Sequence, residues 1–324
     1  MVRCHQIANG VQADNEALGH KYTICDAGTT STQATACFTE AINAKPSVIL
    51  VGGDGVSVAG PGYAAAKKAG IPLVGVITSN PVGTGEGATM ADAMVADGKG
   101  AADVLYAGET SQSYDAARNA SFAPEFKKDC PTCGSAYLAF DYPTIQQTLP
   151  RQIQTALIQD PKVKLDRGRV RPSGKRRGHS GATGLSSISV AGMDGNPRNV
   201  QLIRQGQVQK SDLAVGEGED GWAVADAAPR MYSGLPLPVN VPVNTFVIRP
   251  ANVSQVDSST NVWQGPNTYQ QLFKTLWGMS WLSPMFAGAD GSREPTTLPV
   301  GTVGVCGSLA ACWAGSREPM AGNQ

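Results

Sequence analysis

The chain has 324 residues, with 26 basic and 26 acidic side chains, so its formal net charge is zero. Only 16% of the residues are charged and 41% are hydrophobic, which excludes an intrinsically disordered chain, because such chains are richer in charge and poorer in apolar residues. Seven cysteines in a chain of this length exclude a small disulfide scaffold. The sequence contains no run of about 20 apolar residues, so it predicts no membrane-spanning helix. The length suffices for about two domains.

Short apolar strands and helices alternate along the first part of the chain. The predicted elements, in chain order, are helix 6–18, strand 20–26, helix 33–44, strand 47–51, helix 63–69 and strand 71–77. Continuous apolar strands that alternate with helices are typical of a parallel sheet covered on both faces. This part of the sequence therefore predicts one α/β lobe.

The same alternation then starts again. The predicted elements of this second unit are helix 90–97, strand 103–107, helix 112–127, strand 136–140, helix 144–159, strand 187–191, helix 197–205, strand 212–215, helix 220–233 and strand 244–248. Two such units predict an α/β protein with two doubly wound parallel-sheet lobes. Residues 279–324 are rich in Gly and Pro without periodicity, and we expect a disordered C-terminal tail there.

Several motifs, in the right order along residues 5–278, resemble type I periplasmic sugar-binding proteins of the ribose-binding kind. The run Ala69-Gly-Ile-Pro-Leu-Val-Gly-Val is similar to a strand signature of that family. Val190-Ala-Gly-Met-Asp194-Gly-Asn-Pro and the helix that follows look like its Asp-Gly turn. The resemblance implies an N-terminal lobe of residues 1–82 plus 217–242 and a C-terminal lobe of residues 83–216 plus 243–278.

Two features depart from this family pattern. From the first residues we expect neither the strand that would precede the first helix nor an export signal before it. The second departure is the segment 165–183, where the family has a strand and a helix. It overlaps residues 162–177, which carry eight basic side chains and one acid. A solvated basic loop is one interpretation, and a frameshift in a GC-rich gene is the one we favour. Nucleic-acid binding is disfavoured, because no aromatic residue interleaves the basic ones.

Ligands of open parallel sheets bind beyond the carboxyl ends of the strands, so the loops there supply the candidate site. Asp and Glu accept hydrogen bonds from two sugar hydroxyls at once, and aromatic rings cover the sugar ring. The candidate ligand-binding residues are Asp194, Asp141, Phe140, Thr78, Ser79, Asn80, Glu217 and Asp26. For Asp194 the resemblance also implies a sugar-binding carboxylate.

Most of these candidates have a structural alternative. Asp194 fits the start of the helix ahead of Pro197, and Asp141 fits a turn. Glu217 or its neighbour Glu219 fits a solvent-exposed loop, and Asp26 fits the cap of the next helix. Residues 79–81 fit a simple turn.

The cysteine spacing predicts two structural disulfides, Cys25 with Cys37 and Cys130 with Cys133, which favours an oxidising compartment. A redox-active or zinc-binding role for the Cys130-Pro-Thr-Cys133 motif is the alternative. Because no second such motif pairs with it and the three histidines are scattered, we expect no metal.

The interpretation favoured by these observations is the solute-binding component of an ABC-type sugar importer. It implies a non-enzymatic monomer in the periplasm or at the cell surface, which binds a small-molecule sugar and ABC permease subunits, with no cofactor and no nucleic acid. One alternative is the effector domain of a sugar-responsive transcription repressor. Another is a kinase, because Gly52-Gly-Asp-Gly55 resembles the phosphate loop of NAD and diacylglycerol kinases, although Val56 stands where a Thr is usual.

Overall fold

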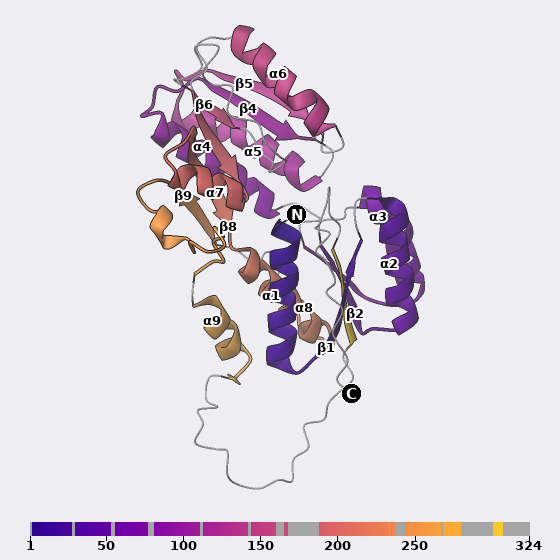
Figure 1. The fold of residues 1–324 in the computed structure, drawn as a ribbon. Helices are drawn as coiled ribbons and strands as arrows, with labels where there is room; N and C mark the ends of the chain where they lie inside the picture. Colours follow the sequence, from indigo (N-terminus) through magenta and orange to yellow (C-terminus); the bar gives the residue numbers. More distant parts are fainter. Residues whose placement is uncertain are drawn as a thin grey trace, which may run out of the picture.

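The computed structural model describes most of the chain as two α/β lobes, each built round one sheet (Figure 1). The described residues are 2–27, 30–52, 56–76, 81–110, 113–141, 144–159, 165–167, 188–232, 234–236, 244–266, 268–279 and 301–306. The two sheets share no strand. The expected class, two doubly wound parallel-sheet lobes, is confirmed.

The first lobe is built on a four-stranded parallel sheet with the order β1-β10-β2-β3. Its strands are β1 (Lys21–Asp26), β2 (Val48–Gly52), β3 (Leu73–Val76) and β10 (Gly301–Cys306). The helices packed on it are α1 (Val2–Leu18), α2 (Ser31–Ala44), α3 (Val56–Lys68) and α8 (Glu217–Tyr232). One core joins α2 and α3 to one face of β2, and another joins α1 and α8 to the opposite face. The sheet is therefore covered on both faces.

The second lobe is built on a six-stranded sheet with the order β5-β4-β6-β7-β8-β9, in which only β9 runs antiparallel. Its strands are β4 (Val104–Glu109), β5 (Ser135–Phe140), β6 (Leu165–Arg167), β7 (Ser189–Met193), β8 (Gln209–Val215) and β9 (Thr245–Ile248). Its helices are α4 (Pro81–Asp97), α5 (Ser113–Asp129), α6 (Ile145–Gln159), α7 (Pro197–Arg204) and the short 3-10 helix η3 (Val253–Gln255). The largest core packs Met90 and Met94 of α4 and Phe122 of α5 on the sheet.

Helix α9 (Tyr269–Leu276) follows the second lobe in sequence but contacts α8. The expected division of the chain places this segment in the C-terminal lobe. An aromatic contact explains its position, because Trp277, just after α9, stacks on Trp222 of α8 with ring centroids 5.3 Å apart. The Nε1 of Trp277 also donates a hydrogen bond of 2.7 Å to Asp226 of α8.

Two strands occupy segments where the sequence predicted none. Residues 301–306, in the tail expected to be disordered, form β10 between β1 and β2. Residues 165–167 form β6 between β4 and β7, although no strand was expected in 165–183. Each fills a gap between two parallel strands whose backbone N–H and C=O groups need partners, and backbone pairing requires no apolar side-chain pattern. The rest of both segments, 168–183, 280–300 and 307–324, lies outside the described residues.

Helices α1 and α8 approach each other closely through glycines. A Cβ atom at Gly10 of α1 would lie 2.5 Å from the carbonyl oxygen of Gly218 in α8. A Cβ at Gly221 would lie 2.4 Å from the carbonyl oxygen of Ile7. Only glycine permits this approach, so the glycines fix the distance between the helices.

Both expected disulfides are present. Cys25 at the end of β1 bonds Cys37 in α2, and Cys130 bonds Cys133 after the end of α5. The second pair lies at a helix C-terminus, where the helix dipole destabilises a thiolate rather than activating it. That position favours a structural role over redox catalysis.

Asp14 of α1 is fully buried, and neither of its carboxylate oxygens has a hydrogen-bond partner among the described residues. Burial, and secondly repulsion from Asp226 of α8, raise the pKa of Asp14 to about 8. The unfolded chain releases this proton near pH 3.8, but the folded protein holds it to about pH 8. The contribution of the protonated Asp14 to the free energy of unfolding is therefore fully present below about pH 4 and is lost as the pH rises towards 8.

We predict that Asp14→Asn removes this pH dependence, because an amide mimics the protonated carboxyl at every pH. Urea unfolding should show the variant gaining about 1 kcal/mol or more on the wild type between pH 4.5 and pH 8.5. Glu16→Gln, at an exposed carboxylate of the same helix, is the control and should follow the wild type. Parallel stability curves for Asp14→Asn and the wild type would contradict the assigned pKa.

Candidate ligand-binding site

A small hollow of about 10 Å³ lies at the carboxyl ends of strands β4 and β5 and beside the end of β7. That is room for about one water molecule and is far below the range for small-molecule sites, about 300–1,000 Å³, so a sugar needs the surrounding groups to move apart. The residues that line it are Ala107, Gly108, Glu109, Asp115, Arg118, Asn119, Phe140 and Met193. The hollow thus lies where parallel sheets bind their ligands.

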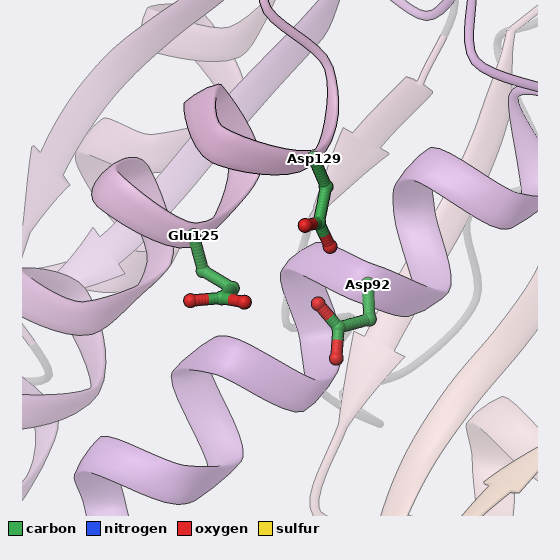
Figure 2. A group of neighbouring side chains, drawn as sticks. All are labelled: Asp92, Glu125 and Asp129. Carbon is green, nitrogen blue, oxygen red and sulfur yellow. The ribbon is translucent and has the colours of Figure 1, made fainter.

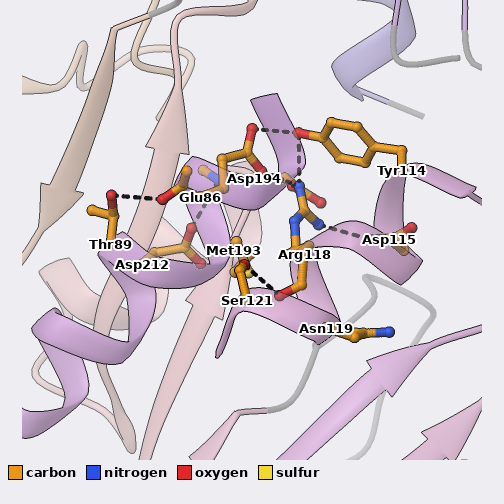
Figure 3. Close-up of polar contacts among 12 residues, drawn as sticks. Glu86, Thr89, Tyr114, Asp115, Arg118, Asn119, Ser121, Met193, Asp194 and Asp212 are labelled. Carbon is orange, nitrogen blue, oxygen red and sulfur yellow. Dashed lines mark hydrogen bonds and ion pairs between the residues drawn. The ribbon is translucent and has the colours of Figure 1, made fainter. Parts of the chain in front are cut away.

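The main charged group of this site is the guanidinium of Arg118, which is only 1% exposed (Figure 3). It forms ion pairs with Glu86 of α4, with Asp115 of α5 at 2.9 Å, and with Asp194 after β7 at 3.0 Å. Tyr114 completes the group, because its hydroxyl accepts a hydrogen bond of 3.1 Å from Arg118 and donates one to Glu86. One cation thus joins three carboxylates from three separate elements.

The guanidinium of Arg118 stays protonated, because its neighbours raise its pKa. Burial acts to lower its pKa, but the carboxylates of Glu86, Asp194 and Asp115 and the Tyr114 hydroxyl raise it well above the usual value. The Nε atom of Arg118 is buried and has no acceptor within hydrogen-bond distance among the described residues. A buried donor without a partner is uncommon and costs free energy.

The first turns of α5 place these side chains. Asp115 lies in the first turn, where the positive end of the helix dipole stabilises a carboxylate, and Arg118 follows one turn later on the same face. Asn119 is fixed beside them, because its Nδ2 donates 2.6 Å to the carbonyl oxygen of Glu109 and its Oδ1 accepts 2.7 Å from the Tyr106 hydroxyl. The polar groups are therefore held in place before any ligand arrives.

Two of the residues chosen from the sequence lie at this site. Asp194 follows β7, and its side chain, 6% exposed, pairs with Arg118. Asp194 is not the cap of the following helix, which was its alternative role, because Asn196 occupies the N-cap position of α7. Phe140 ends β5 and lines the hollow.

Other candidates make different contacts. Oδ1 of Asp141 accepts hydrogen bonds from the backbone N, at 3.1 Å, and the hydroxyl of Thr144, at the start of α6. Asp26 is exposed at the end of β1, and the residue that caps α2 is Thr30. The ligand-binding roles of Asp141 and Asp26 stay predictions.

The two glutamates at the start of α8 are both buried, so neither lies in an exposed loop. Glu217 is the first residue of the helix. Glu219 accepts hydrogen bonds from the backbone N of Asn244, at 3.1 Å, and from its Nδ2, at 2.7 Å. Glu219 thus joins the start of α8 to the start of β9, whereas a ligand role for Glu217 stays a prediction.

Thr78, Ser79 and Asn80, the candidates from the first lobe, lie outside the described residues, as do residues 53–55 of the kinase-like loop. The sequence analysis missed Arg118 and Glu86, because it weighed strand ends only. A signal for Arg118 exists, since Asp115 and Arg118 stand one turn apart in the helix that follows a strand-end loop. No local sequence pattern around Glu86 indicates that it pairs with Arg118.

A second group of carboxylates lies where α4 and the end of α5 run side by side (Figure 2). The oxygen atoms of Asp92, Glu125 and Asp129 lie within 4.8 Å of one another. Partial desolvation, and then a hydrogen bond with Asp129 and repulsion, raise the pKa of Asp92, whereas Lys128 pairs with Glu125 at 2.6 Å. Asp92 and Asp129 are exposed, and exposed acidic groups of this kind are common without an ion, so we assign no metal here.

Solved structures with a similar fold include sugar-binding proteins and ABC transporter solute-binding proteins. An ABC transporter solute-binding protein from Agrobacterium vitis with bound tagatopyranose superposes with a TM-score of 0.67 and 18% identity, covering 80% of this chain and 94% of that one. A second solute-binding protein from the same organism, with bound allitol, superposes with a TM-score of 0.65 and 22% identity, covering 77% of this chain and 91% of that one. A glucose-galactose binding protein from Geobacillus stearothermophilus superposes with a TM-score of 0.62 and 16% identity, covering 78% of this chain and 94% of that one.

These likenesses define the class of fold, that of the periplasmic binding proteins that serve ABC transporters. No protein-family model matches the sequence, and no curated protein matches it either. Among the described residues, no helix has the length and apolar content that crossing a membrane requires.

We predict that Arg118→Met strongly destabilises the protein, because it leaves three buried carboxylates without their shared cation. The expected loss in free energy of unfolding, from chemical denaturation, is about 3–5 kcal/mol. Arg151→Met, at an exposed arginine of α6, is the matched control and should change stability by less than about 0.5 kcal/mol. Equal effects of the two substitutions would contradict a central role for the Arg118 cluster.

Proposed function

We propose that the protein is the solute-binding component of an ABC-type importer and binds a sugar in the cleft between its two lobes. The observation that carries the proposal is the Arg118 cluster, which pairs with Asp194 and lines the hollow where β4, β5 and β7 end. The bound allitol and tagatopyranose of two proteins with the same fold support the ligand class.

The groups at the hollow suit a polyhydroxylated ligand. Carboxylates such as Asp115 and Asp194 accept hydrogen bonds from hydroxyl protons, and the guanidinium of Arg118 donates to hydroxyl oxygens. Phe140 offers an apolar ring surface to a sugar face. A sugar that lacks one of the required hydroxyls would leave a buried charged group unpaired, so such a site discriminates sharply.

No covalent step belongs to this function. The proteins with the same fold are binding proteins, which supports a non-enzymatic role. The ligand enters between the lobes, and hinge closure buries it. The closed form is the state that ABC permease subunits would recognise, because only a liganded protein populates it strongly. We propose that the protein acts as a monomer.

The proposed location is the periplasm or the cell surface. The disulfides Cys25–Cys37 and Cys130–Cys133 support it, because structural disulfides form and persist in oxidising compartments. The proteins with the same fold include components of bacterial sugar transporters.

A panel of aldoses, ketoses and polyols, titrated by calorimetry and by tryptophan fluorescence without any nucleotide, tests the proposal. At least one member of the panel should bind with one site per chain and should reduce the radius of gyration in X-ray scattering. The absence of binding across the panel, or binding that requires ATP, would overturn it, and the ATP result would favour the kinase alternative.

For the sugar that binds, we predict that Asp194→Ala weakens affinity at least about tenfold, because it removes a buried acceptor and a partner of Arg118. The control is Glu40→Ala, at an exposed carboxylate of α2, which should keep the affinity of the wild type. Calorimetric titration of both variants decides the matter, and unchanged binding by Asp194→Ala would remove Asp194 from the site.

A further inference from the structure

We propose that Asp212 is a positioning residue, whose buried carboxylate holds the turn at Asp194 and Gly195 so that the Asp194 side chain meets Arg118. This inference rests on the proposed function, because the value of the turn lies in its presenting Asp194 at the sugar site. Asp212 belongs to β8, is completely buried and is not among the residues that line the hollow. Figure 3 shows it near Asp194 and Met193.

The turn places two consecutive residues in the left-handed region, since Asp194 has a φ of 73° and Gly195 a φ of 57°. For most residues with a side chain this conformation costs about 1–2 kcal/mol, but Asp and Gly enter it more readily. The Asp-Gly pair therefore permits the turn, and contacts such as those with the neighbouring strand fix its position against the sheet.

Strand β8 supplies two such contacts. The backbone N of Asp194 donates to the carbonyl oxygen of Leu213 at 2.8 Å, and the backbone N of Gly195 donates to Oδ1 of Asp212 at 2.7 Å. The second bond is charge-assisted and is the only one of the two that a side chain determines. It ties the left-handed residue directly after Asp194 to the sheet.

The carboxylate of Asp212 is itself held on its other side. Its Oδ2 accepts a hydrogen bond of 2.6 Å from Nδ2 of Asn199, a buried residue of α7. Gly192, which pairs with Asp212 across β7 and β8, leaves the space, because a Cβ there would lie 2.1 Å from Oδ2. A carboxylate suits the position because it accepts from both N–H groups and presents no donor that would clash.

Three variants separate positioning from general stability. Asp212→Leu has a similar size and removes both acceptors. Asp212→Asn keeps an amide oxygen that accepts from the Gly195 N–H. Asn199→Leu also breaks the buried network but leaves the Asp212–Gly195 bond in place, so it is the matched control.

We expect Asp212→Leu to weaken sugar affinity about tenfold or more and Asp212→Asn to weaken it only about threefold. Asn199→Leu should lower thermal stability yet keep affinity within about twofold. Affinity within about twofold of the wild type in Asp212→Leu would overturn the proposal. So would a loss of affinity in Asn199→Leu as large as in Asp212→Leu, since that result marks a merely structural network.

The backbone amide of Gly195 gives a readout that requires no sugar. In a ¹⁵N–¹H spectrum of the full chain, its proton should lie downfield in the wild type and in Asn199→Leu and move upfield in Asp212→Asn. If Asp212→Leu does not fold, this shift decides, and an unmoved Gly195 resonance in Asp212→Asn overturns the proposal. If the wild type binds no sugar, the proposed function fails, and the amide shift still tests the turn separately.

Discussion

The buried guanidinium of Arg118 is the contact on which the site depends. It brings together Glu86, 32 residues before it, and Asp194, 76 residues after it, with Asp115 one turn away. Three buried carboxylates would repel one another without this cation. Arg118 therefore joins the polar groups of α4, α5 and the turn after β7 at the hollow, while the apolar core of Met90, Met94 and Phe122 packs the two helices on the sheet.

Backbone pairing in the two sheets sets the positions of the strand ends. A parallel sheet leaves N–H and C=O groups unpaired wherever a strand is missing, and burial makes that costly. In the first lobe β10 fills such a gap between β1 and β2, and in the second lobe β6 does so between β4 and β7. The β6 segment, Leu165–Arg167, carries little apolar signal, whereas β10 contains two valines and a cysteine in a short run within the Gly- and Pro-rich tail.

The two lobes are connected through α8, which follows β8 of the second sheet and packs on the first. At its start, Glu219 binds Asn244, where the chain enters β9, and further along Trp222 and Asp226 hold Trp277 after α9. Polar and aromatic contacts thus join α8 to the start of β9 and to the end of α9. Under the proposed function, a hinge at this place would let the lobes close over the sugar.

Much of the fold was determined by the sequence alone, because the apolar strands β2, β4 and β7 and their helices carry strong local patterns. The strand-end rule also pointed to Asp194, which pairs with Arg118, and to Phe140, which lines the hollow, while their ligand-binding roles stay predictions. It did not find Arg118 or Glu86, whose roles come from pairing across helices far apart in sequence. Nor did it find β6 and β10, because backbone groups left unpaired in the sheet, and not side-chain patterns, decide where those segments lie.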